Sequence, residues 1–427
     1  MRRSGALTLG VVLTLGAITG GRGQELSGSV TNGSLDGLAL PSMPENWADL
    51  PVKLSAGESV SYNSNLNAIP IGQPNPRGGP QGDFTATSNY GFSTTGRLYG
   101  QQLFLDANLG VIRYLHNVEN NSTIYSLNAG DNWTLTSRCS GGLGVSLSKS
   151  PVALTDLVGV GTGVNFATTT AFNETGNCTV GDGYALLFNS GLTTTTNSNP
   201  VDAVNDARTT LLSAGIEYAK GYDTLTALAS NSQSSFTGRT AAQVALGLAT
   251  VTDFHSFTLA YSRQINPNLS VSGSAGLVGT TSGFTLSLPK SLVPIFSFSA
   301  NWAFTPKLSL NASASRSVAP PTTLIANAEQ SYDATVGLGY QVTPKVNVHA
   351  SGTVGYSTST FTAALVQAGF SPFFTGTQKN YTLNAGLSYS MTPFLSAGLT
   401  ASYSERVGNG LITPQDVVTV SLNYRPF

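Results

Sequence analysis

The feature that most constrains this chain is a strict alternation of apolar and polar residues in its C-terminal half. From residue 381 to residue 391 every odd-numbered residue is apolar and every even-numbered residue is Thr, Asn, Gly or Ser. Residues 395–404 repeat the pattern, and so do segment pairs within 257–275, 296–315 and 332–351. Successive side chains of a β-strand point to opposite faces, so each segment has one apolar and one polar face. A helix would need a period of 3.6, and the alternation therefore predicts β-strands.

Four copies of one turn motif join these strands. Each copy reads apolar, Thr or Asn, Pro, any residue, apolar, and the prolines are Pro267, Pro306, Pro344 and Pro393. Proline presets the φ of a tight turn and gives up only a hydrogen bond that a turn can spare. We expect longer loops at the other ends of the strands, including 317–329, 357–379 and 406–415. Short turns on one side and long loops on the other are typical of outer-membrane barrels.

Three aromatic residues, Trp302, Tyr340 and Tyr389, each lie four residues before a turn proline. They would therefore stand at one height, as the aromatic girdle of a barrel at the periplasmic membrane interface requires. The alternative is cross-strand packing in a soluble sandwich. The opposite face, which is almost purely Ser, Thr, Asn and Gly, favours the membrane interpretation.

Composition and the N-terminus agree with an exported barrel. Charged residues make up 10% of the chain and the net charge is -1, which gives no indication of a nucleic-acid partner. Arg2 and Arg3 precede a short apolar run, so residues 1–23 are predicted to be a signal peptide. We expect residues 24–50 to be a periplasmic lead-in, with a plug of the lumen as the alternative, and residues 51–427 to form the barrel. No later segment approaches the length of a membrane helix, and a closed barrel is the other way to cross lipid.

The N-terminal half carries a weaker form of the same signal. The candidate strands are 52–63, 83–94, 101–115, 123–136, 143–150, 164–175, 183–193, 209–219 and 224–233. About nine more follow, ending with 415–427, for a total of about 18 strands in an all-β, antiparallel, up-and-down transmembrane barrel. Residues 234–253 fit a strand, a loop or a short helix. Phe427 is the kind of terminal aromatic that the outer-membrane assembly machinery reads, although it is out of phase with Tyr424 unless Pro426 marks a bulge.

The residues that could carry chemistry are few and scattered. Cys139 and Cys178 both fall in predicted short turns on one rim, so a disulfide is geometrically plausible and two free thiols are the alternative. The histidines His116, His255 and His349 are far apart, and His349 falls in the inward polar register. No motif pairs a nucleophile with a base, so we expect no enzymatic activity, no cofactor and no metal.

The chain resembles the β-barrel porin type 2 family of outer-membrane proteins. The likeness lies in an opening strand at 52–66, in the stretch from Asn132 through Trp133 to Cys139, and in the Thr-Pro turns. It extends over nearly the whole mature chain. Several members are associated with exopolysaccharide gene clusters, so the resemblance implies surface-polysaccharide export with polysaccharide or its export machinery as partner. It implies no catalytic residues.

A lumen lined by hydroxyls and amides suits sugars better than phosphates or ions, which would favour Arg or Lys rings. The first hypothesis is therefore an outer-membrane channel for export or diffusion of carbohydrate. The second is a structural or adhesive barrel that displays Thr- and Asn-rich loops such as 193–199.

Overall fold

The computed structural model contains one closed, antiparallel, up-and-down barrel. It describes residues 52–66, 69, 71–72, 81–98, 101–152, 165–198, 202–245, 249–282, 292–319, 328–360, 377–408 and 411–425. Its 18 strands form a single sheet in which each strand pairs with its neighbours in the sequence, and β1 pairs with β18 to close the ring. The all-β barrel predicted from the alternation is therefore confirmed. The signal peptide, the lead-in, Pro426 and Phe427 lie outside the described residues.

The strand bounds show how long the alternating segments are. They are β1 Val52–Asn63, β2 Asp83–Leu98, β3 Gln101–Tyr114, β4 Ser122–Thr134, β5 Cys139–Val152, β6 Asn165–Gly181, β7 Tyr184–Asn197, β8 Ala207–Lys220, β9 Asp223–Phe236, β10 Val251–Asn266, β11 Leu269–Ser282, β12 Leu292–Thr305, β13 Leu308–Ala319, β14 Ala328–Thr343, β15 Val346–Thr360, β16 Thr377–Ser390, β17 Leu395–Gly408 and β18 Leu411–Tyr424.

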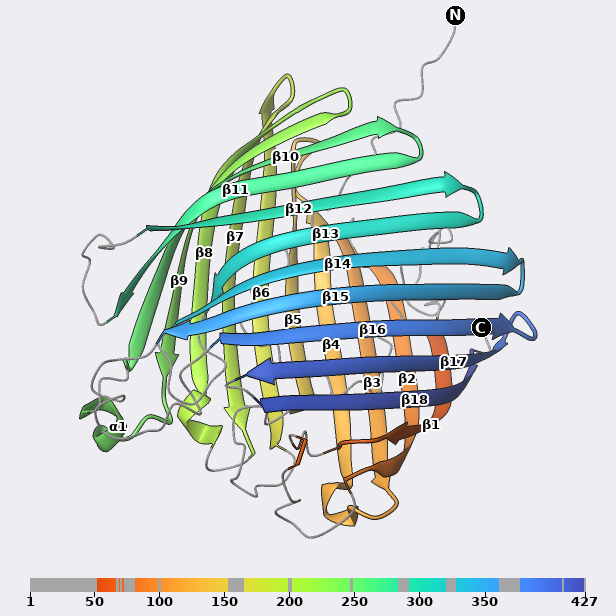
Figure 1. Ribbon diagram of the computed structural model, residues 1–427. Coiled ribbons are helices and arrows are strands. Elements are labelled where there is room, and N and C mark those ends of the chain that lie inside the picture. Colours follow the sequence, from red (N-terminus) through yellow and green to blue (C-terminus); the bar gives the residue numbers. More distant parts are fainter. Residues whose placement is uncertain are drawn as a thin grey trace, which may run out of the picture.

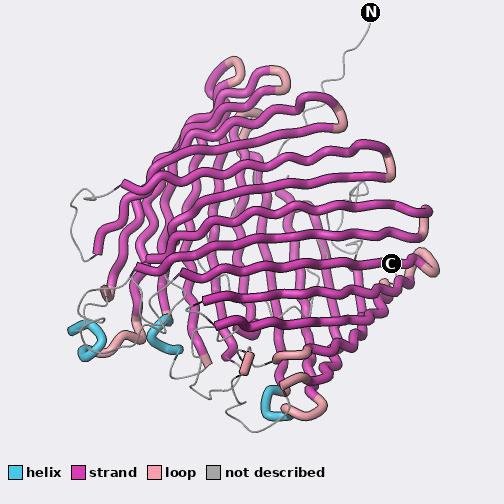
Figure 2. Tube along the Cα trace, viewed as in Figure 1, coloured by secondary structure: helices cyan, strands magenta, loops and turns pink. Residues whose placement is uncertain are grey.

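The two ends of the barrel differ in their connections. Hairpin turns gather at the upper right of Figure 1, where β10–β11, β12–β13 and β14–β15 reverse. The helical segments lie at the opposite end in Figure 2; they are η2 Val118–Asn120, η3 Asp202–Asn205 and α1 Ala241–Ala245. We call these the turn end and the loop end. No helix in the described part of the chain is long and apolar enough to cross a bilayer.

Several predicted boundaries need correction. The prediction of a long loop at 406–415 was wrong, because β17 runs to Gly408 and β18 begins at Leu411. The last strand was predicted at 415–427 and begins four residues earlier for the same reason. In the uncertain stretch 234–253, β9 continues to Phe236, the short helix α1 follows, and β10 begins at Val251.

The Thr-Pro turns work through the residue before the proline. The Thr305 hydroxyl accepts hydrogen bonds from the backbone N–H groups of Lys307 (3.2 Å) and Leu308 (3.0 Å). Thr343 and Thr392 accept the equivalent pairs, and Asn266 accepts one from Asn268. The side-chain oxygen thus provides an acceptor for backbone N–H groups at the turn.

A fifth copy of this turn has no proline. Thr136 accepts hydrogen bonds from the backbone N–H groups of Arg138 (3.2 Å) and Cys139 (3.1 Å), between β4 and β5. The residue in the proline position is Ser137. A side-chain oxygen before the proline position, from Thr in four turns and from Asn266 in the fifth, is therefore the common element, and the proline is not.

Alternation separates the strands into an outer wall and an inner wall. In β14, Val336 and Leu338 are 55% and 44% exposed, whereas the alternating residues Thr335 and Gly337 are half-buried and buried. Side chains on the concave side of a closed sheet have more neighbours, so the polar register faces the lumen. The exposed Val, Leu, Phe and Tyr side chains form a convex surface that hydrocarbon would solvate better than water.

Two glutamates depart from this pattern in mid-strand. Glu58 lies in the outer register of β1 between Ala56 and Val60, and its carboxylate accepts a hydrogen bond from Ser88 of β2 (2.8 Å). Glu174 of β6 is placed in the same way, with Ser190 of β7 as donor (3.4 Å). Carboxylates on a lipid-facing wall are costly, though less so than Lys or Arg, and a hydroxyl on the next strand offsets part of that cost.

Buried polar groups fix the connections at the loop end. The carboxylate of Asp83, at the start of β2, accepts hydrogen bonds from the backbone N–H groups of His116 and Asn117 and from the Asn117 amide. Arg239, which follows β9, lies 3.6 Å from the centroid of the Phe236 ring and donates to the carbonyl of Ala249. Burial lowers the pKa of Arg239 to about 10, so the guanidinium is still protonated at neutral pH.

The turn hydroxyls should contribute measurably to stability. We expect Thr343→Val to lower the free energy of unfolding by about 1 kcal/mol, because Lys345 and Val346 lose their acceptor. Thr343→Ser keeps the acceptor and should leave stability close to that of the natural chain. Urea unfolding of the barrel in detergent micelles measures both, and equal losses in the two variants would contradict the account.

Candidate functional site: the barrel lumen

The inner wall carries pairs of hydroxyls on adjacent strands. Ser272 and Ser299 are 2.7 Å apart, and Ser274 and Ser297 are also 2.7 Å apart, between β11 and β12. Similar pairs join β8 to β9, β13 to β14 and β14 to β15; they are Thr209–Ser234, Ser317–Ser331 and Thr335–Thr353. These pairs are uncharged and polar, and each hydroxyl can both donate and accept.

Charge is unevenly distributed around the lumen. Among the described inner-wall positions of β4 to β13, Glu217 alone is charged, and we call this part the neutral wall. The inner positions of β14 to β18 and of β1 to β3 form the charged wall. They carry Lys53, Asp83, Arg97, Asp106, Glu329, Asp333, Arg406 and the imidazole of His349.

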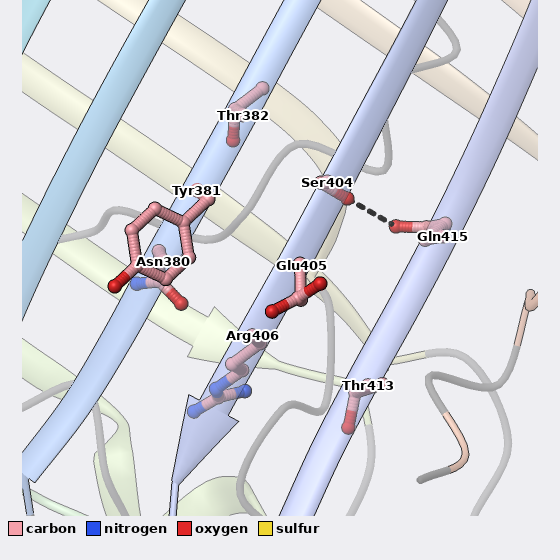
Figure 3. Close-up of a pocket in the computed structure, with 8 residues that line it drawn as sticks. All are labelled: Asn380, Tyr381, Thr382, Ser404, Glu405, Arg406, Thr413 and Gln415. Carbon is pink, nitrogen blue, oxygen red and sulfur yellow. Dashed lines mark hydrogen bonds between the residues drawn. The ribbon is translucent and has the colours of Figure 1, made fainter. Parts of the chain in front are cut away.

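The charged wall includes a recess on β16, β17 and β18, towards the loop end (Figure 3). Ser404 donates a hydrogen bond to Oε1 of Gln415 (3.4 Å), and Arg406 donates to Oε1 of Gln378. Its inner-register lining residues are Asn380, Thr382, Ser404, Arg406, Thr413 and Gln415, whereas Tyr381 and Glu405 belong to the outer register. Amide, hydroxyl and guanidinium groups thus converge on one short stretch of the lumen.

The predicted girdle residues lie on the outer wall near the turn end. Trp302, Tyr340 and Tyr389 are all exposed, and the ring of Trp302 stacks on that of Phe304 with centroids 3.4 Å apart. Their contact with a membrane interface stays a prediction. The fourth proline turn carries Arg263 at the equivalent position, in an ion pair with Asp223 (3.6 Å).

Sequence reasoning missed further aromatics at this end. Tyr184 begins β7 and Tyr218 lies two residues before the end of β8, with ring centroids 4.7 Å apart, and both lie within three residues of a hairpin turn. Trp133 lies over Gly141, where an added Cβ would collide with the indole. These aromatics could have been found from their proximity to hairpin turns. They were missed because those turns lack the proline motif.

The two cysteines lie in strands, which corrects the prediction that both fall in short turns. Cys139 begins β5 and is directly opposite Cys178 of β6, with their Cα atoms 4.2 Å apart and their sulfurs bonded. Both occupy the outer register next to Trp133 and Gly141. The pair therefore joins two strands that the ladder already pairs.

The histidines are not brought together. His349 lies on the inner wall over Gly386. His116 contacts Asp83 (3.1 Å), whose oxygens already accept several backbone and amide donors. Within the described ranges no three His, Cys, Asp or Glu side chains are grouped so that they could hold a metal ion. The absence of catalytic residues stays a prediction.

The Thr-rich segment proposed as a surface loop lies elsewhere. Residues 193–197 belong to β7, where Thr195 contacts Thr169 across the inner wall (3.3 Å). The segment that was offered as an example of a displayed loop therefore no longer supports the adhesive hypothesis.

Comparisons with known proteins give structural likenesses only. No protein-family model matches the sequence, and no curated protein matches it. The siderophore receptor PirA from Pseudomonas aeruginosa is similar at 12% identity and a TM-score of 0.43, over 88% of this chain and 80% of that one. OpdK with vanillate, from the same species, has 10% identity and a TM-score of 0.45, over 88% and 98%.

The FrpB iron transporter from Neisseria meningitidis has 12% identity and a TM-score of 0.46, over 83% of this chain and 62% of that one. Likenesses at this level do not bear on what passes through the barrel. The strand pairing itself establishes the fold.

The cysteine pair yields a direct prediction. Protein purified from an oxidising compartment without reductant, then denatured, should take up no maleimide label at Cys139 or Cys178, because their thiols are joined. After reduction both residues should react. Labelling of both cysteines before reduction would show free thiols and contradict the bonded pair.

Proposed function

We propose that this chain is an outer-membrane channel through which carbohydrate is exported or diffuses. The observation that carries the proposal is the neutral wall, a run of ten strands, β4 to β13, in which Glu217 is the one charged residue among the described inner positions. Its other inner positions hold hydroxyls, amides and small side chains, together with some apolar ones such as Leu187, Leu211 and Phe254. Sugars exchange hydrogen bonds with hydroxyls and amides, and no ring of Lys or Arg is present there to favour phosphate.

Two further observations support the membrane part of the proposal. The exposed apolar outer wall would be solvated by hydrocarbon, and the closed sheet satisfies backbone hydrogen bonds that lipid could not. The N-terminal Arg pair and apolar run favour export. Outer-membrane lipid and the assembly machinery that reads a C-terminal strand are then the expected partners, and the resemblance to exopolysaccharide-associated porins suggests polysaccharide as cargo.

Conductance in planar bilayers tests the proposal. The full mature chain should form open channels with little preference between K⁺ and Cl⁻, and maltohexaose should reduce the current. Ser274→Arg adds a cation to the neutral wall and should shift permeability towards Cl⁻, whereas Ser274→Thr should not. A sealed barrel without conductance would refute the channel.

A further inference from the structure

Basic side chains of the outer wall gather at the loop end. Seven Lys and Arg residues of the described strands occupy the outer register, and two of them, Lys220 and Arg263, lie near the turn end, where both are opposite Asp223. The other five lie within three residues of the loop end of their strands; they are Arg113, Lys149, Arg208, Arg316 and Lys379. None of these five forms an ion pair with a described residue.

The carboxylates at this end of the outer wall are engaged within the barrel. Asp253 accepts a hydrogen bond from Gln233 (2.8 Å), and Glu405 accepts one from the hydroxyl of Tyr403 (2.6 Å). Asp416 accepts a longer one from Ser64 (3.4 Å). The five basic groups therefore have no anionic partner within ion-pair distance on the described strands.

Two of the five belong to a row across four adjacent strands. Arg316 of β13 is opposite Tyr332 of β14, Tyr332 is opposite Tyr356 of β15, and Tyr356 is opposite Lys379 of β16. These strands lie side by side at the front of Figure 1. All four residues occupy the outer register, and we call them the Arg-Tyr-Tyr-Lys row. Two cations thus flank two aromatic rings at one level of the outer wall.

Contacts inside the row hold Arg316 and the rings in place. The guanidinium carbon of Arg316 is 5.0 Å from the centroid of the Tyr332 ring, and its Nη2 donates to Oε1 of Gln330 (3.3 Å). The rings of Tyr332 and Tyr356 pack edge to face, with centroids 5.8 Å apart. Cation–π and edge-to-face contacts of this kind favour one arrangement of the side chains.

The row keeps cationic donors that face outward. Lys379 is exposed, and its ammonium has no partner among the described residues. The Nε of Arg316 is buried, but its Nη1 is open to the surroundings and has no partner in the described part of the chain. Glu405 of the next strand bonds Tyr403, which lies on the turn-end side, away from the level of Lys379. Both ends of the row are therefore positively charged.

Towards the turn end the same face becomes apolar. Val354 lies one outer position below Tyr356 and is 53% exposed, and Leu383 of β16 is 61% exposed. Val336 of β14 continues this surface. A molecule lying on this face meets cations at its upper edge and apolar side chains below. A water-soluble anion would use only the first of these, whereas an anionic lipid would use both.

We propose that the Arg-Tyr-Tyr-Lys row binds the phosphate-bearing headgroup of an anionic lipid, whose acyl chains lie on Val336, Val354 and Leu383. This proposal rests on the membrane placement in the proposed function and is independent of whether the lumen conducts. Phosphate oxygens accept charge-assisted hydrogen bonds from the ammonium and the guanidinium. Tyrosines suit the boundary between headgroups and acyl chains, because their rings are apolar and their hydroxyls polar.

Quenching by brominated lipids tests the row locally. A bimane label is placed at Val354→Cys in the full mature chain carrying Cys139→Ser and Cys178→Ser, in vesicles at about pH 8, where imidazoles are ordinarily uncharged. Phosphatidic acid and phosphatidylcholine with the same brominated acyl chains are compared as quenchers. With two cations present, we expect phosphatidic acid to be preferred about 25-fold at this label, and Lys379→Gln or Arg316→Gln to lower that preference about fivefold each.

Three controls separate the row from general attraction to charge. Lys379→Arg should keep the preference, and Lys220→Gln, which removes an outer-wall cation near the turn end, should leave it unchanged. A label at Phe257→Cys, six residues from the loop end of β10 as Val354 is from that of β15, should show no preference. Quenching by brominated phosphatidylcholine shows that each variant has entered the bilayer.

The outcomes distinguish this surface from the channel. Equal quenching by the two lipids at 354, or a preference at 354 that both Gln variants retain, would refute the row and leave the channel. Loss of the preference on adding inorganic phosphate at the concentration of the lipid would show a site for a soluble anion and overturn the lipid assignment. A barrel that shows the preference but does not conduct would support the row and refute the channel. A chain that stays in the water phase would overturn both.

Discussion

The hydrogen-bond ladder that closes β1 on β18 is the constraint on which the rest of the structure depends. Ala56 to Asn63 pair with Tyr424 to Val417, so the first and last strands have neighbours on both sides. An open sheet would leave two rows of unpaired N–H and C=O groups, which lipid cannot satisfy. Once the sheet is closed, alternation alone assigns each side chain to an inside or an outside.

This separation explains the composition. A chain with few charges and diluted apolar residues does not need one central hydrophobic core, because many of its large apolar side chains are turned outward and the buried ones form small clusters, such as Phe254, Val278 and Val318. The inner wall is free to vary, and it varies by sector: Glu217 is the one charged residue among the described inner positions of β4 to β13, whereas several charged residues line the remaining strands. Glu58 and Glu174 show that the outer wall tolerates an exception when a serine on the next strand donates to the carboxylate.

The sequence allowed the fold to be predicted where alternation was strict. Residues 381–404 were assigned to two strands and a Pro393 turn, which the structure confirms as β16 and β17. Boundaries were wrong where small residues blur the pattern. Gly408 to Gly410 was taken for part of a long loop, although Asn-Gly is a common signal for a tight hairpin. Cys139 and Cys178 were assigned to turns because flanking Gly and Ser residues resemble turn sequences.

The candidate site could be predicted only in its general character. The polar face of the alternating segments predicted a lumen lined by hydroxyls. Thr335, Thr382 and Ser404 were assigned to that face because they alternate with apolar residues in the sequence. The juxtaposition of Asn380, Arg406 and Thr413 in the recess could not be predicted, because it depends on the register of two strand pairs. A shift of one residue in the register of either strand pair would turn one of the three side chains to the outer wall. Strand ends predicted from sequence are not precise enough to fix those registers.

The central claim is that one side of each strand meets hydrocarbon while the other meets water. Nitroxide labels at Val336→Cys and Thr335→Cys, in a chain carrying Cys139→Ser and Cys178→Ser, test it on neighbouring residues in lipid vesicles. The account predicts that the label at 336 collides mainly with oxygen dissolved in lipid and the label at 335 mainly with a water-soluble nickel complex. A label at 336 shielded from both reagents would place that side chain inside a packed protein core and contradict the account.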